Sequence, residues 1–322
     1  MDNRISKLHE FVRPEYFFWG ALLCAGFLFF FENGPDMPAP SSAEAAAITA
    51  ISEPSSNPYD TLELLAKGAY VYDVARKKEL FAKNANEVLP LASITKVMTA
   101  ITALSIAPET TDIKIDDESL RAEGDSGLEV GERWTLADLL TFTLLESSND
   151  GAVAVSTTIG EALSTSTGSS GTYRAEFVLA MNTLARRLGL SSSVFFNESG
   201  LDIDESHAGA FSSPRDAAMM LAYALDTFPA VFTKTRLSSL ALTNEKEDRP
   251  AENTNTETNS FPLLLASKTG YTDLAGGNLV IAFDAGFGQT IVVSVLGSTI
   301  DGRFADAEAL VWATLRYLAS GR

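Results

Sequence analysis

Cysteine and histidine are scarce in this chain, and their scarcity excludes several kinds of site. The 322 residues include one cysteine, Cys24, so no intrachain disulfide can form. The two histidines, His9 and His207, lie far apart in the sequence, so a zinc site of clustered histidine and cysteine side chains is not expected. We therefore expect no metal and no organic cofactor.

Basic residues are also few. The chain has 24 Lys and Arg against 42 Asp and Glu, a formal net charge of −18. Nucleic acid is excluded as a partner, because phosphate binding needs Lys and Arg to displace counterions. The remaining composition, 46% hydrophobic and 20% charged residues with 22 Gly and 12 Pro, is typical of a globular protein and excludes a collagen or a wholly disordered chain. The length allows one large domain or two small ones.

One uncharged apolar run stands near the N-terminus, at Tyr16–Phe31. As a helix it would span about 24 Å, slightly less than a hydrocarbon core of about 30 Å. Three basic residues precede it within residues 1–15, which predicts a cytoplasmic N-terminal segment and an outward-facing remainder. The run is either a transmembrane anchor or the core of a signal peptide. We favour an uncleaved anchor, because the Ala43-Glu44-Ala45 cleavage pattern lies far beyond Phe31.

Composition separates a tether from a folded domain. Residues 32–58 contain five of the 12 prolines among Ala and Ser, which predicts a semi-extended tether of at most about 80 Å. Residues 59–322 read as one globular domain. Residues 1–31 are neutral overall, so the whole net charge of −18 lies in the part placed outside the membrane.

The order of elements in this domain predicts its architecture. Alternating or β-rich apolar runs predict strands at 69–74, 79–84, 263–267, 278–283 and 290–296. Helical spacing predicts helices at 89–104, 139–145, 151–159, 176–188, 214–225 and 305–318. Another apolar segment starts at Leu62–Leu65, and Thr243–Ser260 reads as a polar surface loop. Strands from both chain termini with helices between them predict an α/β (α+β) fold, in which a sheet packs against an inserted helical region.

A possible nucleophile stands at the start of the helix predicted at 89–104, in the motif Ser93-Ile94-Thr95-Lys96. Spacing i to i+3 puts Ser93 and Lys96 on one helix face. A serine hydroxyl needs a neighbouring base, and a lysine serves if burial and a second cation lower its pKa. The free N–H groups at a helix N-terminus could also hold an oxyanion.

Two further motifs could complete such a site. Ser147-Ser148-Asn149 lies in a polar break between two predicted helices, where a hydroxyl and an amide could relay a proton and bind a peptide-like substrate. Lys268-Thr269-Gly270 follows a predicted strand and offers a second cation, a hydroxyl and close backbone approach. Each motif alone is weak, and Ser-x-Asn recurs at Ser55–Asn57 in the tether. The three in this order are much more specific.

These motifs resemble those of the serine–lysine penicillin-recognising enzymes. From about Ala69 to Leu318 the chain is similar to the low-molecular-mass D-alanyl-D-alanine carboxypeptidases, a subgroup of the penicillin-binding proteins. The likeness includes LPLASITKVMTA, GLEVGERWTLADLLTFTLLESSNDGAVAV, FVLAMNTLARRLGLSSSVFFNESGLD, FSSPRDAAMML and KTGYTDLAGGNL. It implies a β-lactamase/transpeptidase-like fold with an antiparallel sheet, peptidoglycan stem peptides as substrate, and β-lactam antibiotics as ligands. It also implies an extracytoplasmic location, in a periplasm or a cell-wall space, for a domain attached to the bacterial cell membrane.

The resemblance implies a role for each matching residue. Ser93 would attack the carbonyl between two D-alanines, Lys96 would accept its proton, and Ser147 would pass a proton to the leaving amine. Substrate binding would fall to Asn149, Lys268, Thr269, Gly270 and Tyr271, with the N–H groups of Ser93 and Tyr271 as the oxyanion hole.

Other nearby residues carry weaker expectations. Arg303 is read equally as a helper for the substrate carboxylate and as a solvated surface charge. His207 is expected in a surface loop, and Asp273 is expected to be structural. Ser148 replaces the glycine usual in the second motif, at a position where we expect the change to be tolerated.

Other activities remain open from the sequence. A D,D-endopeptidase of the same family would use the same residues. A class A-type β-lactamase also needs a glutamate that activates water, and the expected loop is replaced here by the carboxypeptidase-like FVLAMNTLARRLGL. A wall-binding or antibiotic-sensing module would acylate without turnover.

Overall fold

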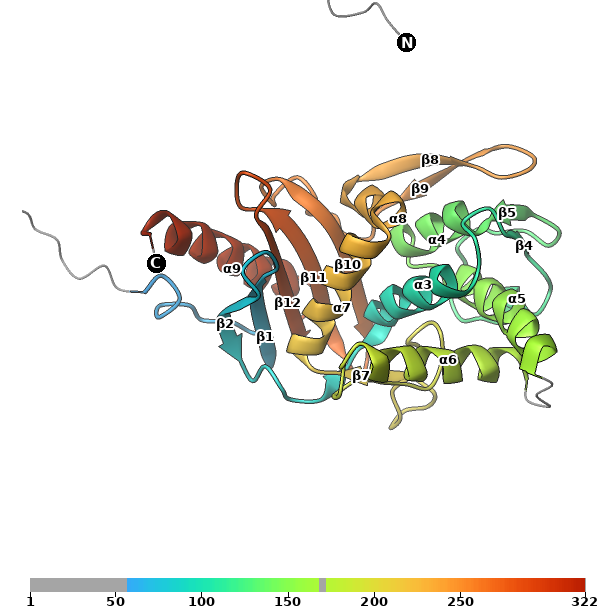
Figure 1. Ribbon diagram of the computed structural model, residues 1–322, viewed down its shortest axis with the longest axis horizontal. Helices are drawn as coiled ribbons and strands as arrows, with labels where there is room; N and C mark the ends of the chain where they lie inside the picture. The colour runs from blue at the N-terminus through green and yellow to red at the C-terminus, as the bar shows by residue number, and fades with distance from the viewer. Residues whose placement is uncertain (1–56, 168–171, 322) are drawn as a thin grey trace, which may run out of the picture. The chain divides into compact units, whose positions relative to one another are not determined.

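The computed structural model describes residues 57–167 and 172–321 (Figure 1). The expectations for the segments 1–15 and 16–31, and for nearly all of the tether 32–58, therefore lie outside the described residues. Among the described residues no helix is both long and apolar enough to cross a bilayer.

The strands are β1 (Gly68–Asp73), β2 (Lys78–Lys83), β3 (Leu89–Pro90), β4 (Asp112–Lys114), β5 (Arg133–Thr135), β6 (Val194–Phe195), β7 (Ala210–Ser212), β8 (Ser239–Thr243), β9 (Asp248–Glu252), β10 (Leu264–Thr272), β11 (Gly276–Asp284) and β12 (Thr290–Ser298). The α-helices are α3 (Thr95–Ile106), α4 (Leu136–Leu145), α5 (Asn149–Thr167), α6 (Tyr173–Arg187), α7 (Pro214–Thr227), α8 (Pro229–Phe232) and α9 (Gly302–Ala319). Three 3₁₀ turns complete the set: η1 (Ala92–Ile94), η2 (Ser119–Arg121) and η3 (Thr233–Arg236).

A five-stranded sheet in the order β10-β11-β12-β1-β2 joins the two ends of the domain. All four pairings are antiparallel, and Val71 of β1 faces Val293 of β12. The predicted α/β (α+β) architecture, with an antiparallel sheet from both termini and an inserted helical region, is confirmed.

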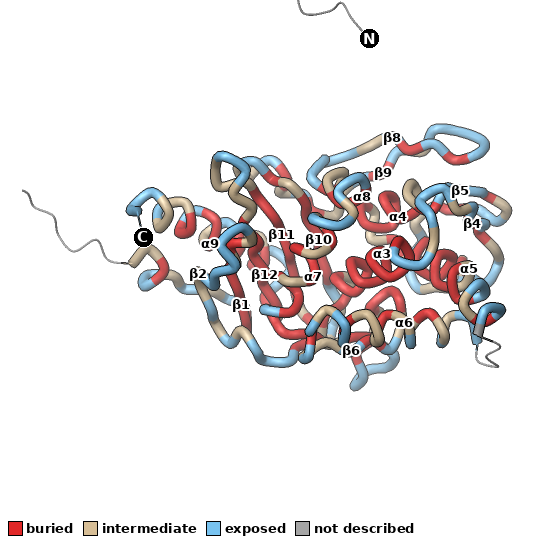
Figure 2. Tube along the Cα trace, viewed as in Figure 1, coloured by how far each residue is buried: buried red, intermediate tan, exposed pale blue. Residues whose placement is uncertain are grey.

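The two faces of the sheet carry separate apolar cores. Successive strand side chains point to opposite faces, so on β11 Leu279 and Ile281 belong to one core while Val280 and Ala282 belong to the other. Helix α9 covers the first face and packs on β11 and β12. Helix α7 covers the second face, beyond which the other helices lie (Figures 1 and 2).

Helix α3 runs through the middle of the helical region and is almost wholly buried (Figure 2). It contacts α4, α5, α6 and α7. A helix that is apolar on all sides needs such enclosure, and residues such as Val97, Met98 and Ile101 are fully buried. Lys96 lies in the first turn of this helix, so its ammonium group is carried into the interior.

Local signals account for several helix ends. Thr135 caps α4 by accepting a hydrogen bond from the N–H of Asp138. Ser213 caps α7 in the same way, with Pro214 at the first helical position. Helix α6 ends just before Gly189, as expected.

Three sequence predictions were wrong in detail. Thr243–Ser260 is not a plain loop: the end of β8 and all of β9 lie within it, as a hairpin. Few side chains of these two strands are buried, so apolar residues, which mark a core strand, are scarce in this segment of the sequence. The helix predicted from Leu89 starts only at Thr95, because Leu89–Pro90 pairs with β7 and a 3₁₀ turn follows. The helix predicted at 151–159 is longer, since α5 runs from Asn149 to Thr167.

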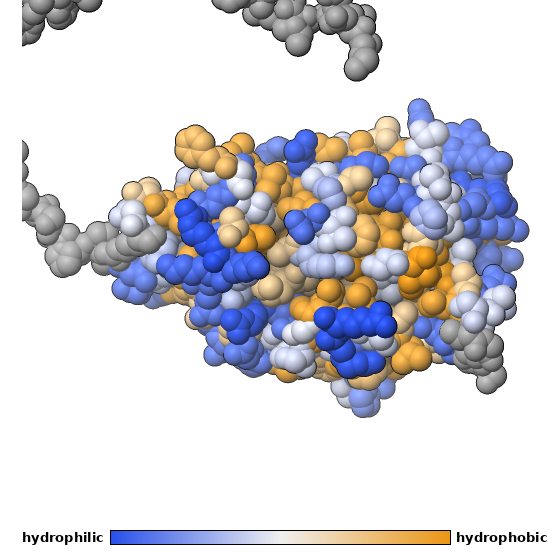
Figure 3. Space-filling model, in the orientation of Figure 1, coloured by the Kyte–Doolittle hydropathy of each residue, from blue (hydrophilic) through white to orange (hydrophobic). Residues whose placement is uncertain are grey.

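Hydrophilic residues gather on the end of the domain that carries β4 and β5 (Figure 3). Arg133 of β5 there contacts Asp112 of β4 and Glu245 of the β8–β9 hairpin. These exposed contacts tie the hairpin to the helical region.

Candidate active site

Ser93 lies in η1, where the chain turns from β3 into α3. The preceding residue, Ala92, has a φ of 49°, in the left-handed region that non-glycine residues rarely adopt. The backbone of β10 passes close by: a Cβ atom on Gly270 would lie 3.1 Å from the backbone N of Ser93. Glycine therefore allows β10 to approach the start of η1, which brings the first and third motifs together.

Lys96 is fully buried and donates three hydrogen bonds. Its Nζ lies 2.8 Å from Ser93 Oγ, 2.7 Å from Asn149 Oδ1 and 2.9 Å from the carbonyl oxygen of Ser199. Burial lowers the pKa of Lys96 from 10.5 to about 7, while the negative charge of Glu198 acts in the opposite direction. Near neutral pH a large share of Lys96 is therefore the free amine, which can accept a proton.

The second motif lies in the turn between α4 and α5. Ser147 has a φ of 59°, and its Oγ accepts a hydrogen bond of 3.0 Å from Lys268 Nζ. Asn149 opens α5, and its side chain bridges Lys96 and the carbonyl oxygen of Glu123. Ser148 is buried and contacts Ser126 instead, so it takes a supporting position.

The third motif lies within β10 rather than after a strand. Lys268 is buried, and burial together with the charges of Lys96 and Arg303 lowers its pKa well below 10.5. Its Nζ also donates to the carbonyl oxygen of Thr269, and Thr269 Oγ1 lies 2.6 Å from Thr254 Oγ1.

The structure thus joins residues from all three motifs. Ser93, Lys96 and Asn149 form one hydrogen-bonded group, and Ser147 and Lys268 form another. Thr269 and Gly270 follow Lys268 along β10, beside η1. Tyr271 is half exposed, and its hydroxyl donates to Asp273 rather than into either group.

The residues with weaker expectations also have clear positions. Arg303 is buried, and its Nη1 donates to the carbonyl oxygen of Gly270 at 2.9 Å, so the interpretation as a solvated surface charge was wrong. Desolvation lowers its pKa. His207 is exposed and pairs with Asp204, as expected for a surface loop. Asp273 contacts Tyr271 near the end of β10.

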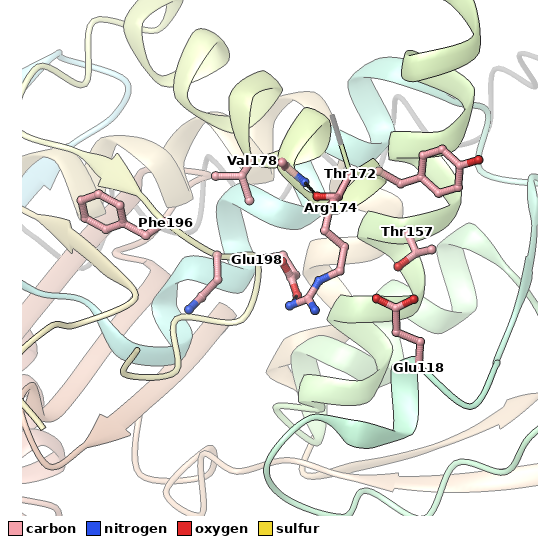
Figure 4. A pocket seen from close by; sticks show the side chains of 10 residues that line it. Glu118, Thr157, Thr172, Arg174, Val178, Phe196 and Glu198 are labelled. Atoms are coloured by element: carbon pink, nitrogen blue, oxygen red, sulfur yellow. Dashed lines mark hydrogen bonds and ion pairs between the residues drawn. The ribbon is translucent and has the colours of Figure 1, made fainter. Parts of the chain in front are cut away.

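Glu198 and Ser199 are parts of the site that the sequence reasoning missed. Both lie in the quoted NESGLD stretch, but no motif marks a backbone carbonyl as a lysine acceptor or a buried glutamate as its neighbour. Glu198 pairs with Arg174 at 2.6 Å and lines a cavity of about 780 Å³ (Figure 4). The lining of this cavity does not include Ser93 or Lys268.

No group of three or more His, Cys, Asp or Glu side chains that could hold a metal ion occurs within residues 57–167 and 172–321. The described site instead brings a serine hydroxyl, Ser93 Oγ, to 2.8 Å from the amine nitrogen of buried Lys96.

Comparison with known families identifies relatives of this arrangement. Residues 52–299 match the family described as D-alanyl-D-alanine carboxypeptidase. The chain is 31% identical over 255 residues to the D-alanyl-D-alanine carboxypeptidase DacF of Bacillus subtilis, covering 76% of this chain and 61% of that protein. It is 27% identical over 249 residues to a D-alanyl-D-alanine endopeptidase of Escherichia coli, covering 75% of this chain and 73% of that protein.

A solved structure shows the same fold. The ampicillin-bound form of penicillin-binding protein D2 from Listeria monocytogenes aligns with a TM-score of 0.63 and 26% identity, over 78% of this chain and 98% of that one. The present chain therefore matches nearly all of one relative of known structure, but less than two thirds of the length of DacF.

Proposed function

The chain belongs to the D-alanyl-D-alanine carboxypeptidase family, and from this premise we propose that it is a serine-type enzyme that removes the terminal D-alanine from peptidoglycan stem peptides. The observation that carries the proposal is the contact between a buried lysine of lowered pKa and a serine hydroxyl, 2.8 Å apart. β-Lactam antibiotics are proposed to acylate the same serine. The solved relative named above binds ampicillin, which supports this.

Acylation follows from the arrangement of the first two motifs. The free amine of Lys96 accepts the proton of Ser93 Oγ as the oxygen attacks the carbonyl carbon between the two D-alanines. The C–N bond then breaks, and the leaving amine takes a proton through Ser147, which contacts Lys268. The product is an ester on Ser93, which water hydrolyses to release the shortened peptide and restore the hydroxyl.

The third motif supplies the binding groups. Lys268 and Thr269 are proposed to receive the terminal carboxylate of the substrate, and Asn149 to hold its amide. The N–H groups of Ser93 and Tyr271 are proposed to stabilise the oxyanion. The close approach of Gly270 to Ser93 supports this, because it brings the backbone of β10 beside η1. Arg303 donates a hydrogen bond to the carbonyl oxygen of Gly270, which helps to hold this part of β10 in place.

We also propose that residues 16–31 attach the protein to the bacterial cell membrane and that the domain acts on its outer side. The uncharged apolar run and the basic residues before it support this. Separating membranes from cells that make the full chain tests it: the chain should sediment with the membranes and be open to protease added outside. Removing residues 1–31 should release it.

The activity is tested with the full chain in detergent. Labelled penicillin should attach stably to Ser93, and a diacetyl-Lys-D-Ala-D-Ala peptide should lose one D-alanine. Both reactions should be lost in Ser93→Ala, with an unchanged circular dichroism spectrum as the control for folding. Rapid penicillin turnover without D-alanine release would instead indicate a β-lactamase. Labelling without turnover of any peptide would indicate a sensing module.

A D,D-endopeptidase is the second candidate, and the similarity to the Escherichia coli endopeptidase supports it. Both activities break a bond that follows a D-alanine, and they differ in what leaves. A cross-linked dimeric stem peptide and the simple tripeptide should therefore be compared under the same conditions. Faster cleavage of the tripeptide supports the carboxypeptidase, and faster cleavage of the cross-link supports the endopeptidase.

A further inference from the structure

The segment Asn197–Gly200 is fixed against the start of α3. The carbonyl oxygen of Ser199 accepts a hydrogen bond from Lys96 Nζ, and that of Glu198 accepts one of 2.6 Å from Thr99 Oγ1. Gly200, with a φ of 82°, packs so closely that a Cβ atom there would lie 1.9 Å from the carbonyl oxygen of Ala92. The backbone of this segment therefore cannot move away from Lys96 without breaking several contacts.

The side chain of Glu198 is almost fully buried, with 1% of it exposed. Its Oε1 accepts a hydrogen bond of 2.6 Å from Arg174 Nη2. Arg174 lies in the first turn of α6, and its side chain is 41% exposed and lines the cavity from which the ion pair can be reached (Figure 4). Figure 4 shows its guanidinium group between the side chains of Glu198 and Glu118. Arg174 thus supplies the cation that pairs with this buried carboxylate.

We propose that Glu198 is a positioning residue of the reaction: its buried carboxylate, held by Arg174 on the segment that is hydrogen-bonded to Lys96 and Thr99, places a fixed negative charge beside the base. The proposal rests on the proposed acylation of Ser93. Glu198 itself is not a proton acceptor for Ser93, because its carboxylate is bonded to Arg174 and its contact with α3 is through the backbone.

Two charged groups act around Lys96. Glu198 lies on the segment behind it and favours the ammonium form, whereas Lys268 on β10 is a like charge. The other groups bonded to Lys96 Nζ are Ser93, Asn149 and the Ser199 carbonyl, which carry no charge. The carboxylate of Glu198 is thus the negative charge that opposes the effect of burial on Lys96.

The direction of the effect follows from this charge. The reaction needs the free amine of Lys96, so the acylation rate rises with pH as Lys96 loses its proton. A group that favours the ammonium form moves this rise to higher pH. Removing the carboxylate should move that rise to lower pH. Removing Arg174 leaves the carboxylate without its cation, so the negative charge acts more strongly on Lys96 and the rise should move to higher pH.

The test is the pH dependence of the rate at which labelled penicillin acylates the full chain, between about pH 5.5 and 9. The midpoint for Glu198→Gln should fall by about one pH unit relative to the unaltered protein, and the midpoint for Arg174→Gln should rise. Glu198→Asp should restore most of the original midpoint, because it keeps the charge.

The matched control is Glu132→Gln. Glu132 is also a buried carboxylate paired with an arginine, Arg249, but it is not among the groups acting on Lys96. It should leave the midpoint unchanged even where it lowers thermal stability. Should Glu198→Gln not fold, Arg174→Gln still gives a shift of predicted sign.

Three outcomes separate the possibilities. Unchanged midpoints in Glu198→Gln and Arg174→Gln, with normal labelling of the unaltered chain, would overturn this inference alone and leave Glu198 with a structural role. An equal shift in the Glu132 control would overturn it as well. No labelling of the unaltered chain at any pH would instead overturn the proposed function.

Discussion

Two regions of this protein bury charge in opposite ways. In the active-site crevice, Lys96, Lys268 and Arg303 are buried near one another, and like charges lower the pKa of Lys268 further. Beside the β8–β9 hairpin, Arg249 contacts buried Glu132 at 2.7 Å and also Glu247. The first region gathers three buried cations, and the second pairs an arginine with carboxylates.

The difference shows what each region is arranged to do. A buried pair of opposite charges joins segments distant in sequence, here Glu132, which precedes β5, and Arg249 of β9. Burying cations destabilises the fold, but burial yields a free amine on Lys96 near pH 7, and the cations form a site that attracts a carboxylate. This loss of folding free energy is confined to the candidate active site. The chain as a whole has a net charge of −18, so the gathering of cations is local.

The largest effect should come from Lys96→Met. Removing the base should slow acylation of Ser93 by about 10³-fold or more. The same change removes a buried cation, so the variant should be more stable at low pH. Labelling with penicillin measures the first effect, and thermal unfolding measures the second.

The pH dependence of that stability has a definite sign. Lys96 has a pKa of about 7 when folded, below its value of 10.5 when unfolded, so the unfolded chain binds more protons between these values. The destabilisation is therefore full below about pH 7 and is relieved as the pH rises toward about 10.5, on the order of 4 kcal/mol over that window. The stability advantage of Lys96→Met should shrink over the same window. An advantage that grows with pH would contradict the assignment.

Lys268→Met should reduce the specificity constant for the D-Ala-D-Ala peptide by about 100-fold, because it removes the proposed charge partner of the substrate carboxylate. The comparison is sharpened by a peptide whose C-terminus is an amide. Its slow cleavage should be affected much less by the change. Equal losses for both peptides would mean that Lys268 does not recognise the carboxylate.

Arg249→Met should break the pair of opposite charges and leave the crevice intact. Glu132 would lose its cation, which should cost about 2 kcal/mol of folding free energy, since Arg249 keeps some exposure to solvent. Denaturant unfolding measures this loss. The acylation rate at a temperature where the variant is folded should stay the same, and a large drop would show that the two regions are coupled.

The smallest effect should come from Thr254→Val, at the edge of the crevice. Thr254 Oγ1 lies 2.6 Å from Thr269 Oγ1, so the variant leaves the Thr269 hydroxyl without this partner. A lost hydrogen bond of this kind costs about 1 kcal/mol, or about fivefold in KM for the peptide. Thr254→Ser keeps the hydroxyl and should behave like the unaltered protein.

Much of the architecture could be predicted because its sequence signals are local. The strands of the main sheet and the helices α6 and α7 follow apolar periodicity and have recognisable caps or end signals. The β8–β9 hairpin was not predicted, because most side chains of its strands are exposed to solvent and because β9 contains Pro250. Such a segment forms a strand because it pairs with its neighbour through backbone hydrogen bonds, which its own sequence does not reveal.

The candidate site could be predicted as a set of residues but not as a network. Ser93, Lys96, Ser147 and Lys268 were found from three motifs, and the structure supplies their contacts. Glu198 could not be found in this way, because its importance comes from being buried beside α3 and paired with Arg174. Burial of Arg303 likewise depends on the placement of the start of α9 beside Gly270 of β10, which no short motif encodes.

The pairing of β1 with β12 has a consequence for when the protein can fold. Val71 of β1 pairs with Val293 of β12, and more than two hundred residues separate these two partners in the sequence. During synthesis the first two strands emerge as a hairpin whose sheet neighbour does not yet exist, and contacts of such sequence separation form slowly. The main sheet therefore cannot be completed until β12 has been synthesised, near the end of the chain.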